Sequence, residues 1–406
     1  MKHTSAFMWN MIGSACYSVS SLVYLMVVTR ICGPVEGGFF SLAYATAQLL
    51  LTVGRYGMRT YQATDLREQY SFGEYSLSRV ITVVVMLLLG FGYSAVSFER
   101  SFIPVSVLVV AMKAIDAVED VYHGRLQQTG HVAQMGQSQA LRNLYTAVCF
   151  TAMLIATKNL LQTLTVTVLS SLALCLAVNI CMVRRFASAQ AEERKQIPAG
   201  VWKLLKSCTG IFVGTFLSLL LYNIPKYAMD GVLDAQYQTY YSILFMPSFV
   251  VTLLCEFVFK PTITTIARRW FDGNRKSFNR MVLGSLGIIA VCGVFIVLAG
   301  HFIGRWMLEL LYGVDLSAYK LHFIVLLVGG TVGACVYMTY NILIAIRKGG
   351  SIKLVYGITA VISILIVRPM IRSWGMMGAA LNYLFSCTML LVIFGGILLH
   401  ICVKRK

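Results

Sequence analysis

Residues 102–125 read FIPVSVLVVAMKAIDAVEDVYHGR. This stretch begins as an apolar run and then places Lys113, Asp116, Glu119 and Asp120 within eight positions. In a chain of 406 residues of which only 12% are charged, that is a dense group of charges. It is either a polar loop or the end of a helix that carries charge where apolar side chains are expected.

The composition points to a helix in a membrane. Hydrophobic residues make up 58% of the chain, and the charged share is about half of that in a soluble domain. We therefore expect an integral membrane protein, most of which lies in the bilayer. The formal net charge of +18 is typical of basic cytoplasmic loops, so it does not indicate a nucleic-acid partner.

Familiar site motifs are missing from the sequence. The 11 cysteines form no CxxC pair and no cluster with histidine, so we expect neither a disulfide framework nor a zinc site. There is no Walker A sequence and no GxGxxG, and nothing therefore supports ATP binding.

Twelve segments are long and apolar enough to span a bilayer. They are residues 7–29, 37–58, 79–98, 101–122, 138–157, 160–182, 206–226, 236–259, 279–300, 319–342, 352–371 and 375–402. If the N-terminus is cytoplasmic, Lys and Arg favour the cytoplasmic segments by about three to one, as the positive-inside rule requires. The sequence thus predicts an all-α polytopic protein with both termini in the cytoplasm.

The longest polar stretch divides these spans into six and six. It predicts an N-terminal six-helix bundle (1–183), a cytoplasmic linker (184–205) and a C-terminal six-helix bundle (206–406). All other loops are short, which leaves no room for a soluble catalytic domain.

The two halves are faintly alike. Arg30 and Lys226 end the first and the seventh span, and a Gly-containing acidic turn follows each. An aromatic pair and a serine then open the next span, as residues 39–41 and 240–242. This pattern indicates a parallel repeat, in which a transporter holds its substrate between two bundles.

The fourth span carries the charges of the opening stretch. Lys113 is expected near mid-membrane, with Asp116 and Asp120 on the same helical face and nearer the cytoplasm. Charges at this depth face a partner or a water-filled cavity. Lys113 and Asp116 either form a structural ion pair or line a cavity. We expect Glu119, Asp120 and His123 to be interface residues.

The second span ends with Arg55 and Arg59, which share a helical face at i, i+4. Arg59 is expected to reach the headgroups. The candidate cavity residues are net basic: Arg30, Arg55, Lys113 and Lys226 against Asp116. Such a cavity suits an anion, and diphosphate is the anion that membrane lipids carry; Arg binds phosphate through paired hydrogen bonds and Lys as a point charge.

Several short motifs suggest a family. They are GPVEG (33–37), FSLA (40–43), GRLQQTGHVAQMGQSQALRNL (124–144), YYSILFMPSF (240–249) and ELLYGVDLSAYK (309–320). With the number and order of spans, they resemble the polysaccharide (O-antigen and capsule, Wzx-like) flippases of the multidrug/oligosaccharidyl-lipid/polysaccharide (MOP) exporter superfamily. The chain departs from the lipid II flippases of that superfamily by having twelve spans, not fourteen.

This resemblance implies a MATE-like pair of six-helix bundles in a V, with a central cavity that opens to each side in turn. The cargo would be an undecaprenyl-diphosphate-linked oligosaccharide, moved to the outer leaflet of the bacterial cytoplasmic membrane for surface polysaccharide synthesis. A transporter of this kind is not an enzyme and needs no cofactor or metal. Whether a proton or a sodium gradient drives it stays open.

The resemblance also implies roles and partners. Arg30, Arg55, Lys113 and Lys226 would hold the diphosphate, and Asp116 would gate the cavity or couple a cation. Membrane lipids and the lipid-linked glycan are the expected partners, together with a polysaccharide polymerase and glycosyltransferases.

Two other classes are weighed against this one. A cation-coupled multidrug exporter of the same fold should have an acidic, more apolar cavity, and the basic excess argues against it. A membrane-embedded glycosyltransferase or polymerase needs a large extracytoplasmic loop with catalytic residues. No outer loop of this sequence is long enough.

Replacing Lys113 tests the expected cavity. We expect Lys113→Ala to reduce display of the lipid-linked glycan at the cell surface, because a phosphate-binding charge is lost, while the protein still inserts normally. Surface glycan and membrane-fraction protein are measured together. Unchanged display in the variant would show that Lys113 has no role in the cavity.

Overall fold

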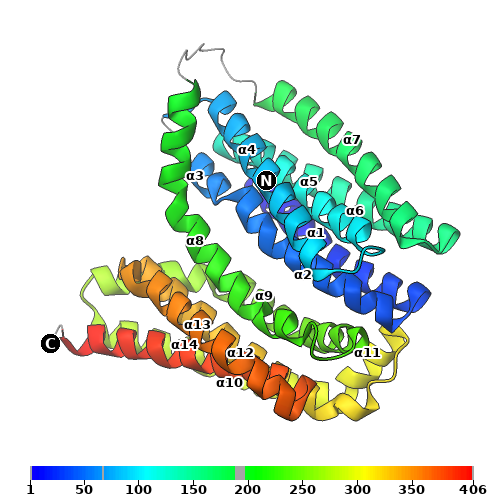
Figure 1. Cartoon of the computed structure of the whole chain (residues 1–406). Coiled ribbons are helices and arrows are strands. Elements are labelled where there is room, and N and C mark those ends of the chain that lie inside the picture. The colour runs from blue at the N-terminus through cyan, green and yellow to red at the C-terminus, as the bar shows by residue number, and fades with distance from the viewer. Residues whose placement is uncertain (1, 66–67, 188–196, 405–406) are drawn as a thin grey trace. The chain divides into compact units, whose positions relative to one another are not determined.

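The computed structural model describes residues 2–65, 68–187 and 197–404, and within these ranges the chain forms helices and no strand. The elements are α1 (Lys2–Cys32), α2 (Pro34–Arg55), α3 (Met58–Thr64), α4 (Phe72–Ser97), α5 (Ile103–Gln128), α6 (Val132–Thr157), α7 (Leu160–Phe186), α8 (Ile197–Met229), α9 (Ala235–Phe271), α10 (Arg275–Ala299), η1 (Gly300–Gly304), α11 (Arg305–Tyr312), η2 (Ser317–Tyr319), α12 (Lys320–Ala345), η3 (Gly349–Ser351), α13 (Ile352–Trp374) and α14 (Met376–Lys404) (Figure 1).

The long helices correspond to the predicted spans. Over the described ranges, 10 helical segments are long and apolar enough to cross a membrane. The other two predicted spans fall on α5 and α9, which are as long but are not among these segments. The predicted all-α polytopic fold class is confirmed.

Some helix ends differ from the prediction. α5 continues to Gln128 and α6 begins at Val132, so the predicted boundaries at 122 and 138 were wrong by about six residues. Three polar residues there, Arg125, Gln127 and Gln128, hydrogen-bond to other segments of the N-terminal unit. Part of the predicted linker is helical: residues 184–186 belong to the end of α7, and residues 197–205 belong to the start of α8. Residues 188–196 lie outside the described residues.

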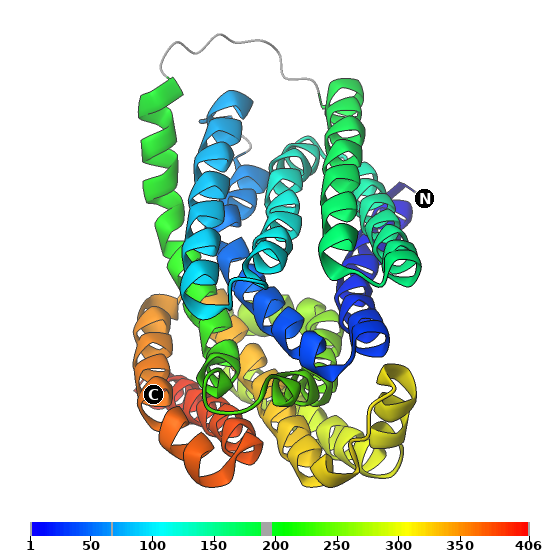
Figure 2. The same cartoon turned by 45° about the vertical axis from the view of Figure 1, so that its right-hand side comes forward.

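The chain divides into two compact units within α8, after residue 216. In the N-terminal unit, Met1–Phe216, the central helix is α5, which packs against α2, α3, α4 and α7. α1 packs along α6, and α6 also packs against α7. The long helices of this unit run alongside one another in both views (Figure 1, Figure 2).

The C-terminal unit, Leu217–Lys406, repeats part of this order of packing. Its central helix is α12, which packs against α9, α10 and α14, and α13 packs against α14. α9, α10, α12 and α14 thus pair as α2, α4, α5 and α7 do. This correspondence supports the predicted repeat.

Polar hydrogen bonds join α6 to α7 and α13 to α14. In the N-terminal unit, Ser138 Oγ donates to Asn179 Oδ1 at 2.8 Å, between α6 and α7. In the C-terminal unit, Ser363 Oγ donates to Asn382 Oδ1 at 2.8 Å, between α13 and α14. All four residues are buried. Such bonds fix the pairing of helices where apolar burial alone gives little specificity in lipid.

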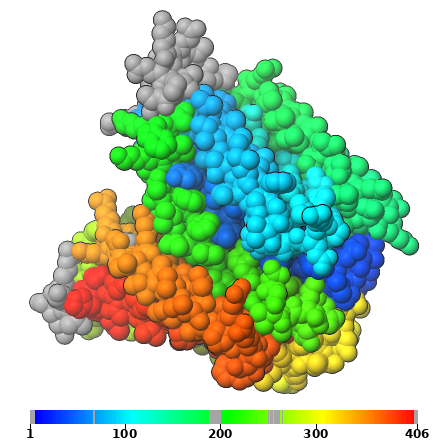
Figure 3. Space-filling view, in the orientation of Figure 1, coloured from blue at the N-terminus to red at the C-terminus, as the bar shows by residue number. Residues whose placement is uncertain are grey.

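Outward faces of the helices are apolar. Leu88 and Phe91 of α4 are exposed, as are Leu354 and Leu365 of α13. α13, in orange, forms part of the surface in Figure 3. Exposed apolar faces on long helices are those that a bilayer covers.

A break separates α2 from α3. Tyr56 and Gly57 both have positive φ, 49° and 69°, which ends the helix after Arg55. A Cβ on Gly57 would lie 2.7 Å from the Ile211 side chain, so glycine also allows close approach of α8. Tyr56 stacks on Phe212 with 4.5 Å between ring centroids.

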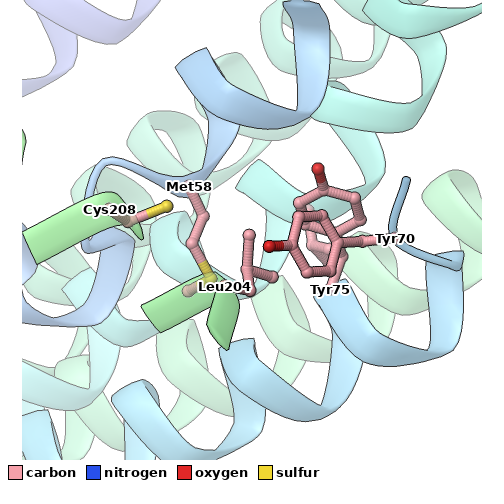
Figure 4. Packing of buried hydrophobic residues seen from close by; sticks show 6 residues of the cluster. Met58, Tyr70, Tyr75, Leu204 and Cys208 are labelled. Carbon is pink, nitrogen blue, oxygen red and sulfur yellow. The ribbon is translucent and has the colours of Figure 1, made fainter. Parts of the chain in front are cut away.

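The first part of α8 is anchored on the N-terminal unit beside this break. A buried cluster joins it to α3, α4 and α5, and the cluster consists of Met58, Tyr70, Tyr75, Val121, Leu204 and Cys208 (Figure 4). Because α8 supplies two of these side chains, its first turns belong to the core of this unit.

The contact between α1 and α6 tests the packing. Gly136 lies against the backbone of Trp9, and an added Cβ would overlap it at 2.4 Å. We expect Gly136→Ala to lower the melting temperature of the purified protein in detergent, since overpacking typically costs about 1–3 kcal/mol.

Gly284→Ala is the matched control. No heavy atom lies within 4 Å of a Cβ added at Gly284 on α10, so alanine should be neutral or slightly stabilising there. Equal melting temperatures for the two variants would contradict the close approach of α1 and α6.

Candidate functional site

The polar residues of α5 are buried inside the N-terminal unit. Lys113, Asp116, Glu119, Asp120 and His123 are each at most 5% exposed. They follow one another over three turns of the central helix, and the surrounding helices supply their partners. We call the ion pairs formed there the α5 ion network.

Asp116 and Arg142 form the first part of the α5 ion network. Asp116 Oδ2 accepts from Lys113 Nζ at 3.0 Å, and Oδ1 accepts from Arg142 Nη2 at 2.6 Å. The same Arg142 nitrogen lies 2.8 Å from Glu119 Oε2. Arg142 of α6 thereby bridges two carboxylates that would otherwise repel each other one turn apart on α5.

Asp120 is the centre of the second part. Its Oδ2 accepts from Arg79 Nη2 of α4 at 2.7 Å. Arg79 also donates to the Gly54 carbonyl at the end of α2, at 2.5 Å. Arg59 and Arg55 approach Asp120 Oδ1 less closely, at 3.6 Å and 3.8 Å. Asp120 is therefore held tightly by one arginine and loosely by two.

Aromatic rings enclose the first part. The Lys113 ammonium lies 4.9 Å from the ring centroid of Tyr17 on α1 and 4.8 Å from that of Tyr44 on α2. The Arg55 guanidinium lies 5.6 Å from the Tyr17 ring. Cation–π contacts of this kind stabilise charges that have lost water.

The α5 ion network has an excess of positive charge. Within the described residues, its contacts join five cations (Arg55, Arg59, Arg79, Lys113 and Arg142) to three carboxylates. The side chains of Arg55 and Arg59 are 35% and 28% exposed. Arg55 and Arg59 are thus the least buried cations of the network.

The structure places the predicted site residues in different settings. Arg55, Lys113 and Asp116 come together in the α5 ion network. Arg30 is exposed near the end of α1. Lys226 belongs to the C-terminal unit, where its ammonium lies 5.5 Å from the Phe245 ring centroid.

Three expectations were wrong. Glu119, Asp120 and His123 are not interface residues but buried members of, or neighbours to, the network. Arg59 does not extend to headgroups, since it lies beside Asp120. Arg55 and Arg59 do not share a helical face, because the helix breaks between them at Tyr56 and Gly57.

Arg79 and Arg142 were missed as site residues, because basic residues near the ends of spans were assigned to cytoplasmic loops. One sequence signal could have found Arg79: the Ser71–Glu74 capping box places the start of α4 two turns before it. Arg142 lies three turns inside α6. The first turns of α6 are polar, so the sequence predicted a shorter helix. In the described part of the chain, no group of three His, Cys, Asp or Glu residues could hold a metal ion.

The bridging role of Arg142 can be measured. We expect Arg142→Leu to destabilise the protein by about 3–5 kcal/mol, because Glu119 and one oxygen of Asp116 are left without a cation. The yield of monodisperse protein in detergent and its melting temperature report the loss. Arg184→Leu, at an exposed arginine of α7, is the control. Similar losses in both variants would rule out a specific role for Arg142.

Comparison with known proteins identifies the fold. No family model and no curated protein matches the sequence. Solved structures do match: an outward-facing multidrug resistance MATE family transporter of the MOP superfamily has a TM-score of 0.61 and 12% identity, over 99% of this chain and 97% of that one. The lipid II flippase MurJ, in an inward closed conformation, has a TM-score of 0.68 and 12% identity, over 95% and 86%.

A MOP superfamily transporter from Pyrococcus furiosus matches with a TM-score of 0.53 and 14% identity, over 99% of this chain and 96% of that one. At such low identities the likeness concerns the fold alone. The chain has the multi-span membrane fold of MOP superfamily transporters, which include both exporters and a flippase.

Proposed function

We propose that this protein is a flippase that moves an undecaprenyl-diphosphate-linked oligosaccharide from the inner to the outer leaflet of the bacterial cytoplasmic membrane. The glycan would serve surface polysaccharide synthesis, of the O-antigen or capsule type, with both termini of the protein in the cytoplasm. A polymerase and glycosyltransferases would be its partners.

The observation that carries this proposal is the pair of accessible arginines in the α5 ion network. Asp120 is neutralised by Arg79 at 2.7 Å, whereas Arg55 and Arg59 lie more than 3.5 Å away from it. These two can therefore turn to a phosphate group without leaving a buried carboxylate unpaired. Arginine is suited to this role, since its planar fork donates two parallel hydrogen bonds to phosphate oxygens.

The other candidate residues have different parts in the proposal. Lys113 and Asp116 hold each other, so Lys113 reaches a phosphate only when Asp116 releases it. That exchange is the gating role proposed for Asp116. Arg30 and Lys226 stay proposed contacts of the diphosphate.

A cation-coupled multidrug exporter is the second candidate. The similarity to MATE transporters supports it as well as the flippase, because the fold is common to both. The electrostatics separate the two proposals: a cationic drug needs a carboxylate with spare negative charge, and each carboxylate of the α5 ion network is paired with a cation.

Purified protein in liposomes tests the proposed function. We expect it to move fluorescent undecaprenyl-diphosphate oligosaccharide between leaflets, as measured by bleaching with a membrane-impermeant reductant. The double variant Arg55→Ala/Arg59→Ala should be slower by about ten-fold or more, since two charge-assisted bonds to phosphate are lost. Replacement by lysine should retain an intermediate rate.

Arg184→Ala, at an exposed arginine outside the α5 ion network, is the control and should keep the wild-type rate. Uptake of the cationic dye ethidium is measured in the same liposomes. Dye transport without lipid movement would replace the flippase proposal with the exporter.

A further inference from the structure

Five cations of the C-terminal unit are concentrated where α9 ends and α10 begins. They lie within two helical turns of the connection, and we call them the α9–α10 basic surface: Arg268, Arg269, Arg275, Lys276 and Arg280. Four of the five are exposed, and Arg275 is half-buried. Asp272 is the single acidic residue between positions 268 and 280. The surface therefore carries a strong positive charge.

The protein itself does not neutralise this charge. Over the described residues, ion pairs join cations such as Arg79 and Arg142 to carboxylates, but none includes a member of the α9–α10 basic surface. Arg275 and Lys276 also lie in the first turn of α10, where the helix dipole disfavours a positive charge. A bound anion would relieve both this placement and the mutual repulsion of the cations.

The connection between the two helices is tightly folded. The Asn274 N–H donates to the Arg269 carbonyl at 3.1 Å, and Gly273 between them has a φ of 75°. The side chain of Asn274 then caps α10, since its Oδ1 accepts from the Ser277 N–H at 3.1 Å. The cations are thus carried by an ordered turn, which holds them together without a ligand.

Aromatic side chains belong to the same turn. The Arg275 guanidinium lies 3.8 Å from the ring centroid of Trp270, which is buried and packs on Phe278 with 5.0 Å between ring centroids. This cation–π contact fixes Arg275 in place. Phe271, in contrast, is 61% exposed and lies among the cations in the sequence. An apolar ring beside exposed cations suits the boundary between lipid headgroups and acyl chains.

The position in the fold agrees with such a boundary. α10 begins a segment, Arg275–Tyr312, that is long and apolar enough to cross a membrane, so its first turns lie at the membrane surface. An anionic phospholipid has a phosphate for the cations and acyl chains for Phe271. A soluble anion would use the charge alone and would leave the exposed ring without a partner.

We infer that the α9–α10 basic surface binds the headgroup of an anionic phospholipid, with Phe271 inserted beside the acyl chains. Basic clusters next to a membrane span attract anionic lipids, and arginine adds paired hydrogen bonds to the phosphate oxygens. The site lies outside the α5 ion network and does not depend on what the protein transports. A lipid bound there would hold the joined ends of α9 and α10 at the membrane surface.

Native mass spectrometry of the protein in detergent, titrated with cardiolipin, tests the inference. We expect the wild-type protein to bind cardiolipin about ten-fold or more tightly than the zwitterionic phosphatidylcholine. The triple variant Arg269→Gln/Lys276→Gln/Arg280→Gln should bind cardiolipin at least about ten-fold more weakly, since each basic residue near an anionic headgroup contributes up to about five-fold. Its melting temperature should stay at the wild-type value, because the three replaced side chains are exposed.

Arg347→Gln/Lys348→Gln/Lys353→Gln is the matched control. It removes the same number of exposed positive charges from the same unit, near the connection of α12 and α13, and should keep the wild-type affinity. Phe271→Ala should weaken the binding of cardiolipin although it leaves every charge in place. Inorganic pyrophosphate supplies negative charge without acyl chains, so it should displace cardiolipin only at a far higher concentration.

Each other outcome contradicts the inference. Equal losses in the two triple variants would show attraction by net charge alone, and equal binding of cardiolipin and phosphatidylcholine would show no preference for an anion. Full displacement by pyrophosphate at concentrations similar to those of cardiolipin, with no effect of Phe271→Ala, would assign the surface to a soluble anion. None of these measurements involves movement of a lipid-linked glycan, so the proposed function is tested separately.

Discussion

The ion bridge from Arg142 to Asp116 and Glu119 is the interaction on which the N-terminal unit depends. Two carboxylates one turn apart on a buried helix repel each other, and an unpaired charge in lipid or protein interior is costly. Arg142 removes both penalties with one guanidinium, provided that α6 lies close to α5. The glycine at position 136 then lets α1 pack closely on α6. The electrostatic demand of one helix thus sets the positions of its neighbours.

Much of the fold could be predicted from the sequence, because membrane spans are read from length and polarity alone. Apolar length predicted twelve spans, and the order of helix packing agrees with the repeat inferred from two short motifs. The boundaries near α5 and α6 were wrong for one reason. Polar residues were taken as the ends of spans, although Gln134 and Gln137 lie in the first turns of α6.

The α5 ion network was predicted only in part, for a related reason. Spacing along one helix showed that Lys113 and Asp116 share a face, but it contains no information about the helices that lie opposite. Arg79 and Arg142 contact α5 from α4 and α6, and the sequence of α5 contains no pattern that predicts these contacts. The break at Tyr56 also hid the way in which Arg59 reaches Asp120, since a positive φ at a tyrosine is uncommon.

The two units share an order of packing but differ in chemistry. α5 carries the buried charges of the N-terminal unit, whereas α12, in the corresponding place, has Lys320 at its first position as its single charged residue. In the described part of the C-terminal unit, aromatic rings such as Tyr241, Phe245 and Tyr383 contact one another. The repeat has therefore kept its architecture while the charge has been concentrated in one copy.

The uneven hold of Asp120 on its three arginines has a consequence for how salt acts on the protein. Dissolved ions screen charges that water reaches and hardly affect those that it does not. Water hardly reaches Arg79, whereas Arg55 and Arg59 are partly exposed to it. We therefore expect salt to weaken the contacts of Arg55 and Arg59 with Asp120 and to leave the contact of Arg79 intact. The single carboxylate of Asp120 thus takes part both in contacts that salt can weaken and in a contact that salt hardly reaches.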